Sequence, residues 1–334
     1  MSLRSALACA VVACLALSPA ASVEPNRNAS DPSTVWTSVA PLLRGVAGFA
    51  HGAAEGRLIV GGGTLWEGDQ KRTLSTVQTY DPAEDRWREA PAWPRSFSFG
   101  VFAVWTDRLV AAGGDAGGST RADRVDGGHP NWSLLRPVAY AGCALLNGKL
   151  YILGGTPDLA SLAHAAPTFL AVDPASGTVE SLPDFPGAPR IHVALAAAAG
   201  RIWAFTGGIW DSRVGQLRNS DDAWSYASES RTWRKLSPFP FPARGVAALA
   251  LDERFILLAG GYRTDGNAQA MTAACLVYDT WEDRYHAAAQ LPVPVMLAGL
   301  DRVGCDVYAI GGENAPRQRS ACVFRAPVAA LLKL

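Results

Sequence analysis

The sequence predicts an all-β fold built from repeated units. Pairs of adjacent glycines recur at nearly even spacing, and each pair follows a short apolar segment, such as Leu150–Leu153 before Gly154-Gly155. The first glycine of each pair stands at positions 62, 113, 154, 207, 260 and 311, in steps of 51, 41, 53, 53 and 51 residues. A repeat of about 50 residues is typical of a β-propeller, in which each unit forms one blade.

Each unit contains four strand signals. Strand one follows a turn with Pro and Arg, as at 95–104, and strand two ends at the glycine pair. Strand three ends in Tyr or Val before Asp, and strand four carries an aromatic residue. Tyr80 and Trp87 therefore lie seven positions apart, as do Tyr226 and Trp233. We expect these large side chains to fill the space between neighbouring blades, and the glycines to allow tight turns near the axis.

The two ends of the repeat region complement each other. The last unit carries three strand signals and stops without a fourth, whereas Val35-Trp36-Thr37 is a lone strand signal before the first unit. We therefore predict a six-bladed propeller over 35–325. Its last blade is completed by the N-terminal strand, because closure removes exposed sheet edges. Residues 326–334 are expected to form a C-terminal tail.

Residues 1–22 have the composition of a secretory signal peptide. Arg4 supplies a positive charge, residues 6–17 are apolar but too short to span a bilayer, and small residues follow. Residues 23–34 are polar and contain two prolines, which is typical of a linker. We predict export to the periplasm or the extracellular space, with lipid anchoring at Cys14 as the weaker alternative. No other stretch is apolar enough for a membrane span.

The charge of the chain argues against nucleic acid as a ligand, and the spacing of Cys and His argues against a metal. The chain has 30 Lys and Arg against 30 Asp and Glu, so it lacks the basic excess that a nucleic-acid-binding protein uses to neutralise phosphates. No Cys or His residues have metal-site spacing, so no metal is expected. We expect four cysteines to pack among apolar strand residues, with pairing of the last two as the alternative in an exported protein: Cys143, Cys275, Cys305 and Cys322.

The glycine pairs, the Tyr80/Trp87-type pairs and Asp-Pro turns such as Asp81-Pro82 together resemble the kelch-repeat family over roughly 35–325. This resemblance implies the propeller fold, but kelch propellers host enzymes, sugar-binding proteins and protein-docking modules. The signal peptide, the single propeller and the strand exchange also resemble the exported six-bladed N-acetylneuraminate mutarotases (epimerases), which interconvert sialic acid anomers. That second resemblance implies an isomerase that needs neither a metal nor another cofactor.

Five arginines stand just before strand one of successive units. Equivalent positions of successive blades surround one axis, so these side chains are predicted to meet at one mouth of the central channel. A guanidinium binds a carboxylate through two parallel hydrogen bonds, which suits an acidic ligand. The alternative is that each arginine pairs with a carboxylate or a carbonyl of a neighbouring blade. The set comprises Arg44, Arg95, Arg136, Arg190 and Arg244.

Aromatic and charged residues gather in the loops that follow the glycine pairs. Aromatic rings stack on sugars and polar side chains bond to sugar hydroxyls, so these loops are candidate sugar-binding segments. Exposed loop tips in a Trp-rich chain are the alternative. Because strand one runs opposite to strand two, the loops and the arginine turns are predicted to lie at the same end of each blade. The candidates are Trp66, Trp210, Arg213 and Tyr262.

Interconversion of sugar anomers needs a base for the anomeric hydroxyl, an acid for the ring oxygen and a cation for the carboxylate of an acidic sugar. Glu313 and Glu67 are acid–base candidates because each closely follows a glycine pair. His192 is a further candidate, since it stands two residues after Arg190, on the same strand face, and an imidazole titrates near neutral pH. A structural role is the alternative for each of the three.

Two functions follow from the sequence. The first is an exported, monomeric propeller that binds a small sugar acid or glycan at the channel mouth and interconverts its anomers. The second is a noncatalytic scaffold that binds protein or cell-envelope polysaccharide. In the second case we expect each arginine to pair with a carboxylate or a carbonyl of a neighbouring blade. We also expect exposed aromatic residues to form a flat patch on an outer face.

Overall fold

The computed structural model describes residues 35–333. The predicted signal peptide at 1–22, the linker at 23–34 and Cys14 lie outside the described residues. Within them the secondary structure is almost entirely β, with one 3₁₀ helix, η2 (Leu162–His164), and one short α-helix, α1 (Val328–Leu331). No helix in this part of the chain has the length and the apolar character needed to cross a bilayer. The predicted all-β class is confirmed.

Five antiparallel sheets of four strands form most of the described chain, and each strand is hydrogen-bonded to the next one of its sheet. In strand order the sheets are β2 (Ala50–Ala54), β3 (Arg57–Gly61), β6 (Val77–Asp81) and β7 (Arg86–Ala90); β10 (Gly142–Leu146), β11 (Lys149–Leu153), β12 (Phe169–Val172) and β13 (Val179–Ser181); β14 (Ala194–Ala198), β15 (Arg201–Phe205), β18 (Ala223–Ala227) and β19 (Thr232–Lys235); β21 (Ala247–Ala250), β22 (Phe255–Ala259), β25 (Cys275–Asp279) and β26 (Arg284–Ala288); and β27 (Gly299–Val303), β28 (Asp306–Ile310), β31 (Val323–Pro327) and β1 (Thr37–Val39). A further sheet has two strands, β8 (Val101–Trp105) and β9 (Arg108–Ala112).

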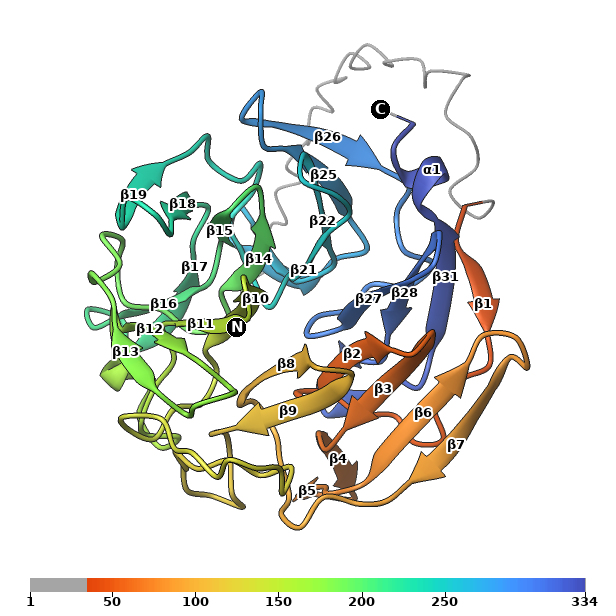
Figure 1. The fold of residues 1–334 in the computed structure, drawn as a ribbon. Helices are drawn as coiled ribbons and strands as arrows, with labels where there is room; N and C mark the ends of the chain where they lie inside the picture. The colour runs from red at the N-terminus through yellow and green to blue at the C-terminus, as the bar shows by residue number, and fades with distance from the viewer. Residues whose placement is uncertain (1–34, 334) are drawn as a thin grey trace, which may run out of the picture. The chain divides into compact units, whose positions relative to one another are not determined.

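The innermost strands of these sheets surround a common centre. In the series β2, β8, β10, β14, β21 and β27 each strand contacts the next, and β27 contacts β2. Figure 1 shows the sheets radiating from this centre. Aromatic side chains fill the spaces between sheets, as predicted: the Tyr80 and Trp87 rings lie 5.2 Å apart and share a core cluster with Tyr308 of the last sheet. This arrangement is that of a β-propeller.

Four of the segments predicted as loops after the glycine pairs are β-hairpins. The start of a hairpin bridges to the segment before strand one of its own unit, as Thr64 does to Ala47 and Glu313 to Met296. The hairpins and the beginnings of the innermost strands therefore lie at the same end, as predicted. The hairpins are β4 (Thr64–Glu67) with β5 (Gln70–Thr73), β16 (Gly208–Asp211) with β17 (Gln216–Asn219), β23 (Tyr262–Asp265) with β24 (Ala268–Met271), and β29 (Glu313–Ala315) with β30 (Gln318–Arg319); β20 (Ala243–Arg244) adds to β23.

The N-terminal and C-terminal strands pair with each other. β1 is antiparallel to β31, with Thr37 opposite Arg325 and Val39 opposite Val323, as predicted for the lone N-terminal strand. Trp36, just before β1, is buried in a cluster between the last two sheets that also contains Leu331 of α1. The segment expected to be a tail from 326 onward thus includes the end of β31 and a packed helix.

The second unit departs from the others, as its sequence does. Its two strands are extended by isolated bridges, including one between Asp123 and Ser133. Arg124 is buried in the segment that replaces strand three, where it bonds to Asp126 at 2.7 and 2.8 Å and lies over the Trp132 ring. A buried ion pair stands here in place of the Tyr-based packing, which explains the broken pattern.

The register of the fourth glycine pair is corrected by the structure. In the other five units both glycines of the pair have positive φ, whereas here the equivalent residues are Thr206, with φ 61°, and Gly207, with φ 118°. The amide of Gly207 donates to the carbonyl of Ala243 at 3.0 Å. In the other units the second glycine of the pair makes this bond, to the turn before strand one of the next unit. The prediction of Gly207 and Gly208 was wrong by one residue, because Gly208 already begins β16.

Replacing Thr206 with glycine is expected to stabilise the protein by about 1 kcal/mol. A β-branched residue at positive φ is strained, at a cost of about 1–3 kcal/mol, and the greater freedom of glycine in the unfolded chain offsets part of the gain. Urea unfolding measures the difference. Gly154→Thr, at the equivalent position, should destabilise, because its Cβ would lie 2.4 Å from the Arg190 carbonyl oxygen. Equal stability of T206G and the parent protein would contradict the strain argument.

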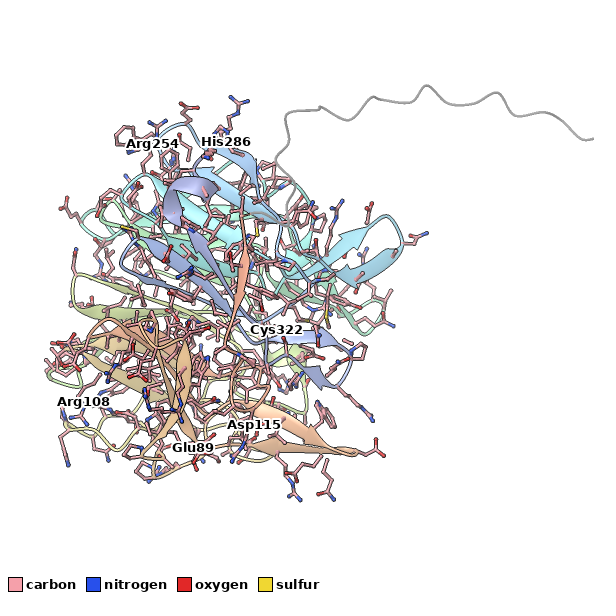
Figure 2. The ribbon with its side chains drawn as sticks, turned by 90° about the vertical axis from the view of Figure 1, so that its right-hand side faces the viewer. Glu89, Arg108, Asp115, Arg254, His286 and Cys322 are labelled. Atoms are coloured by element: carbon pink, nitrogen blue, oxygen red, sulfur yellow. The ribbon has the colours of Figure 1, made fainter. Side chains whose placement is uncertain are left out.

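The four cysteines of the described residues are free. Cys143 and Cys275 lie in strands, as expected. Cys305 and Cys322 are exposed, so the expectation that they pack among apolar strand residues is wrong for these two (Cys322 in Figure 2). Cys305 lies in the turn that begins β28 and Cys322 near the other end of that strand, which explains why they do not pair.

Candidate functional site

A cavity of about 180 Å³ lies between the innermost strands, at the end that carries the hairpins. Backbone hydrogen bonds of 2.7–3.0 Å join five consecutive pairs of residues around its opening, the amide of each residue donating to the carbonyl of the one before. This chain of bonds fixes the side chains that surround the cavity. These six residues, which we call the rim, all have positive φ and stand just before the innermost strands: Gly48, Phe99, Tyr140, His192, Gly245 and Leu297.

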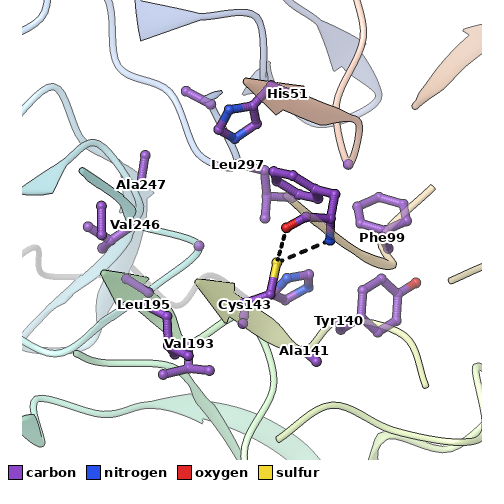
Figure 3. Close-up of a pocket in the computed structure, with 18 of the residues that line it drawn as sticks. His51, Phe99, Tyr140, Ala141, Cys143, Val193, Leu195, Val246, Ala247 and Leu297 are labelled. Carbon is purple, nitrogen blue, oxygen red and sulfur yellow. Dashed lines mark hydrogen bonds between the residues drawn. The ribbon is translucent and has the colours of Figure 1, made fainter. Parts of the chain in front are cut away.

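A second set of residues, three positions after the rim, lines the cavity wall: His51, Phe102, Cys143, Leu195, Ala248 and Leu300. Figure 3 shows the Cys143 thiol between the backbone nitrogen and oxygen of Phe102, each 3.3 Å from Sγ. Burial raises the pKa of Cys143 to about 11, so it remains a thiol at neutral pH. The ring of Phe102 lies 4.7 Å from that of His51, whose Nδ1 lies 2.9 Å from Oδ2 of Asp301. The wall is therefore mostly apolar, with one His–Asp pair.

Of the three predicted acid–base residues, His192 alone lines the cavity. Its ring lies 4.7 Å from the Tyr140 ring. Burial, and to a lesser extent the positive charge of Arg244, lower the pKa of His192 to about 3, so its imidazole is neutral at neutral pH. The prediction that Arg190 lies on the same strand face is wrong, because His192 has positive φ and precedes β14, and Arg190 is buried elsewhere.

The two predicted glutamates lie on hairpins and do not line the cavity. Glu67 ends β4, is exposed and pairs with Arg72 of the same hairpin at 3.2 Å. Glu313 begins β29 and pairs with Arg319 across its hairpin; Arg319 also donates to Oγ1 of Thr64 at 3.3 Å. Each carboxylate thus has an arginine partner, and neither is among the residues that line the cavity.

The predicted arginines do not converge on the cavity. Arg44 pairs with Glu89 at 3.3 Å, and Arg95 pairs with Asp123, both at the surface, while Arg136 is exposed. The five arginines do not stand at equivalent positions: Arg190 and Arg244 stand two residues and one residue before the rim residues of their units, and the other three stand four residues before theirs, so these long side chains do not surround one point. The predicted ring of five cations at a channel mouth is therefore not formed.

The side chain of Arg190 is buried and makes its hydrogen bonds to groups inside the protein. It is 1% exposed, and its three nitrogen atoms donate to the carbonyl of Ala188 at 3.0 Å, the carbonyl of Thr206 at 3.0 Å and the carboxylate of Asp222 at 2.8 Å. The guanidinium also lies 4.7 Å from the centre of the Phe185 ring. Arg190 therefore pairs with a carboxylate and with carbonyls, as the alternative interpretation expects, but these groups belong to its own unit and not to a neighbouring blade.

Arg244 differs from the other four. It is half-buried on β20, where Nη1 donates to Oδ1 of Asn219 at 2.5 Å and the guanidinium lies 4.5 Å from the centre of the Tyr262 ring. Asn219 donates in turn to the Tyr262 carbonyl at 2.7 Å, which fixes the three groups together. Within residues 35–333 no carboxylate pairs with Arg244, and its charge acts on the rim residue His192. Arg244 and Tyr262 are the two predicted ligand-binding residues that the structure brings into contact.

The remaining predicted ligand-binding side chains are spread over the hairpins. Trp66 lies on β4 beneath the guanidinium of Arg317, 5.0 Å from the ring centre, so the β29–β30 hairpin covers this tryptophan. Trp210 is half-buried on β16, and Arg213 is exposed in the turn of the same hairpin. Trp66 and Trp210 therefore stand on different hairpins.

The sequence reasoning missed His51, Asp301 and Tyr140. All three belong to the innermost strands or to the rim, and their relation emerges when the units are aligned on the residue before strand one. That residue is Gly48 in the first unit and Tyr140 in the third. Alignment on the glycine pairs drew attention to the hairpins instead. An alignment on strand one would have placed His51 and Cys143 at one level of a common wall.

One group of metal-ligand-type side chains lies among the described residues, away from the cavity. Asp279, Glu282 and His286 offer ligand atoms within 4.8 Å of one another, and Figure 2 shows His286 and Arg254 close together at the surface. Arg254 donates to Asp279 at 2.9 Å and to Glu282 at 3.1 Å. Both carboxylates therefore already have a cationic partner, and we assign no metal to this group.

Comparison with known proteins gives two kinds of relative. No family model matches the chain. Kelch-like protein 35 of Mus musculus is 25% identical over 259 residues, covering 75% of this chain and 41% of that protein. The human Kelch-like protein 35 is 31% identical over 217 residues, covering 50% and 36%. N-acetylneuraminate epimerase of Yersinia enterocolitica is 26% identical over 190 residues, covering 47% and 48%. The chain spans less than half the length of each relative.

Proposed function

We propose, from the premise that this chain is a kelch-repeat protein, that it is a six-bladed propeller which binds a small acidic sugar at the rim of its central cavity and interconverts the anomers of that sugar. In this proposal the second blade consists of β8, β9 and the bridged segment that follows them. The targeting signal predicted at 1–22 belongs to the same proposal, which sets the site of action outside the cytoplasm.

The observation that carries the proposal is the uncompensated charge of Arg244. A half-buried cation costs free energy unless it is paired, yet its side-chain hydrogen bond goes to the neutral amide of Asn219. The Tyr262 ring holds the guanidinium plane, and a guanidinium has five donors, so several remain for a ligand carboxylate. A carboxylate bound there would compensate the charge and lie beside the rim.

The cavity limits the size of the ligand. Its volume of about 180 Å³ is below the roughly 300–1,000 Å³ of typical ligand pockets. Part of a monosaccharide therefore enters the cavity, and the rest lies at the rim, where the Phe99 and Tyr140 rings are 4.9 Å apart and offer an aromatic surface. N-acetylneuraminate, which gives the similar epimerases their name, is the first ligand to test.

Arg244→Met is expected to weaken the binding of N-acetylneuraminate by about 10- to 100-fold. A hydrogen bond to a charged group contributes about 1.5–3 kcal/mol, and about 1.4 kcal/mol corresponds to a tenfold change in Kd. Titration calorimetry measures the effect. Arg136→Met, which removes an exposed arginine from the turn before strand one of another unit, is the control and should keep Kd within about twofold. Unchanged binding by R244M, or no binding by the unmodified protein, would contradict the sugar-acid proposal.

A second function is supported by a different observation. The match to mouse Kelch-like protein 35 covers 75% of this chain, and Trp281 is 72% exposed. Trp281 follows β25, at the end of the sheets opposite to the cavity opening, and exposed tryptophan is enriched among the residues that dominate protein–protein binding. In this alternative the chain is a noncatalytic scaffold for protein or glycan, and Trp281→Ala, rather than Arg244→Met, removes binding.

A further inference from the structure

We infer that His51 and Asp301 form a proton-transfer pair in the wall of the cavity, in which His51 is the base that removes the proton of the anomeric hydroxyl of a bound sugar. The inference rests on the proposed function, because it names the groups that perform the chemistry of the same site. His51 would be the catalytic residue, and Asp301 the residue that positions it.

The pair joins the first and the last innermost strands. His51 lies on β2 and Asp301 on β27, with Nδ1 and Oδ2 2.9 Å apart. The two side chains are 18% and 12% exposed, and His51 is part of the cavity lining. The Phe49 and Phe102 rings lie 5.6 and 4.7 Å from the imidazole centre. These two ring contacts and the bond to Asp301 restrict the orientation of the imidazole; Figure 3 shows His51 among the residues that line the cavity.

The carboxylate determines which imidazole nitrogen is free. Asp301 accepts a hydrogen bond from Nδ1, which leaves Nε2 as the acceptor of the neutral ring. In residues 35–333 Nε2 of His51 has no hydrogen-bond partner. An imidazole held at Nδ1 by a buried carboxylate, with Nε2 open to a cavity, is the arrangement in which histidine acts as a general base, and the carboxylate then stabilises the imidazolium that forms.

The other titratable groups of the cavity are less suited to accept this proton. His192 has a pKa of about 3, so its imidazole holds a proton poorly at neutral pH. Burial raises the pKa of Cys143 to about 11 and that of Tyr140 to about 12, so both remain protonated. His51 is the cavity-lining group that has a carboxylate partner within the described residues.

The reaction balances without a cofactor. Nε2 of His51 takes the proton of the anomeric hydroxyl, the bond between the anomeric carbon and the ring oxygen breaks, and the ring oxygen takes a proton from water. The carbonyl carbon of the open chain then presents its other face. The chain hydroxyl attacks it, returns its proton to the hydroxide left by that water, and the new anomeric oxygen takes back the proton held by His51. Substrate and product differ in configuration alone.

The test compares anomer exchange and binding in the same proteins. Two-dimensional exchange NMR at pH 7 measures how much the full mature chain accelerates exchange in N-acetylneuraminate, glucuronate and galacturonate, and calorimetry measures their Kd. His51→Gln is expected to lower the acceleration by at least about 100-fold, the lower end for general acid–base catalysis, with Kd changed by less than about threefold. His164→Gln, which alters the exposed His164–Asp158 pair of 3.1 Å, is the matched control and should keep the full acceleration.

The positioning role of Asp301 has its own readout. Asp301→Asn is expected to lower the acceleration by about tenfold or more and to change the ¹⁵N shifts of the His51 ring, because the tautomer is no longer held. Asp301→Glu should restore part of the rate. A merely structural role of Asp301 would lower the stability of D301N without changing the tautomer of His51.

The outcomes separate this inference from the proposed function. Full acceleration by folded H51Q overturns the pair and leaves the proposed function intact. A protein that binds a sugar acid but accelerates no exchange overturns the pair and limits the function to binding, whereas absence of binding overturns the proposed function itself. If H51Q does not fold, diethyl pyrocarbonate treatment of the unmodified protein decides. If His51 is the base, the reagent should modify His51 and abolish the acceleration, and bound sugar should protect His51 from modification. An unreactive His51 overturns the inference.

Discussion

Trp36→Ala is expected to lower the free energy of unfolding by about 3–5 kcal/mol, the range for loss of a buried tryptophan side chain. Trp36 is 3% exposed, and its Nε1 donates to the carbonyl of Ala289 at 2.9 Å. It packs in one cluster with Leu257, Leu291 and Leu331, so it holds the last two sheets and α1 together. Because β1 has three residues, we expect it to leave β31, which exposes the edge of that sheet.

Urea unfolding followed by circular dichroism measures the loss caused by W36A. Trp281→Ala is the matched control, since Trp281 is 72% exposed and its removal should cost no more than about 0.5 kcal/mol. Light scattering should also show self-association of W36A through the opened edge of β31. A W36A protein as stable as W281A would contradict the view that the N-terminal strand holds the last sheet in place.

Arg190→Met is expected to lower the free energy of unfolding by about 3 kcal/mol, although Arg190 and Arg95 both stand in the turn before strand one of their units. Loss of one partner of a buried ion pair costs about 3–5 kcal/mol, and the low end applies because the Asp222 side chain is 30% exposed and regains water. The carbonyls of Ala188 and Thr206 also lose their donor. Arg95→Met removes a surface pair and should cost less than about 1 kcal/mol. Equal losses in urea unfolding would contradict the distinction between these two arginines.

The fold could be predicted from the sequence because its main constraints are local. A pair of positive-φ residues recurs after strand two, and glycine is the residue that adopts this conformation without strain. Thr206 shows the limit of this reasoning. Its conformation is imposed by backbone hydrogen bonds to other segments. The adjacent Gly207 and Gly208 have the sequence of a glycine pair but stand one residue further along the chain than the structural pair, Thr206 and Gly207.

The candidate site was harder to predict because its side chains are positioned by contacts between distant segments. Arg190 and Arg244 follow similar Pro-containing turns, yet one meets the carboxylate of Asp222 and the other the amide of Asn219. His51 and Asp301 are 250 residues apart and meet because the first and last innermost strands are neighbours. A local pattern in one unit contains no information about either encounter.

The rate of anomer exchange in N-acetylneuraminate, measured with a catalytic amount of the unmodified protein, is the decisive test of a sugar-acid site at the rim. We predict exchange cross-peaks that grow with protein concentration, and their loss in Arg244→Met but not in Arg136→Met. Exchange at the rate of the buffer alone, together with no heat of binding in calorimetry, would contradict a sugar-acid site at the rim and favour the noncatalytic scaffold.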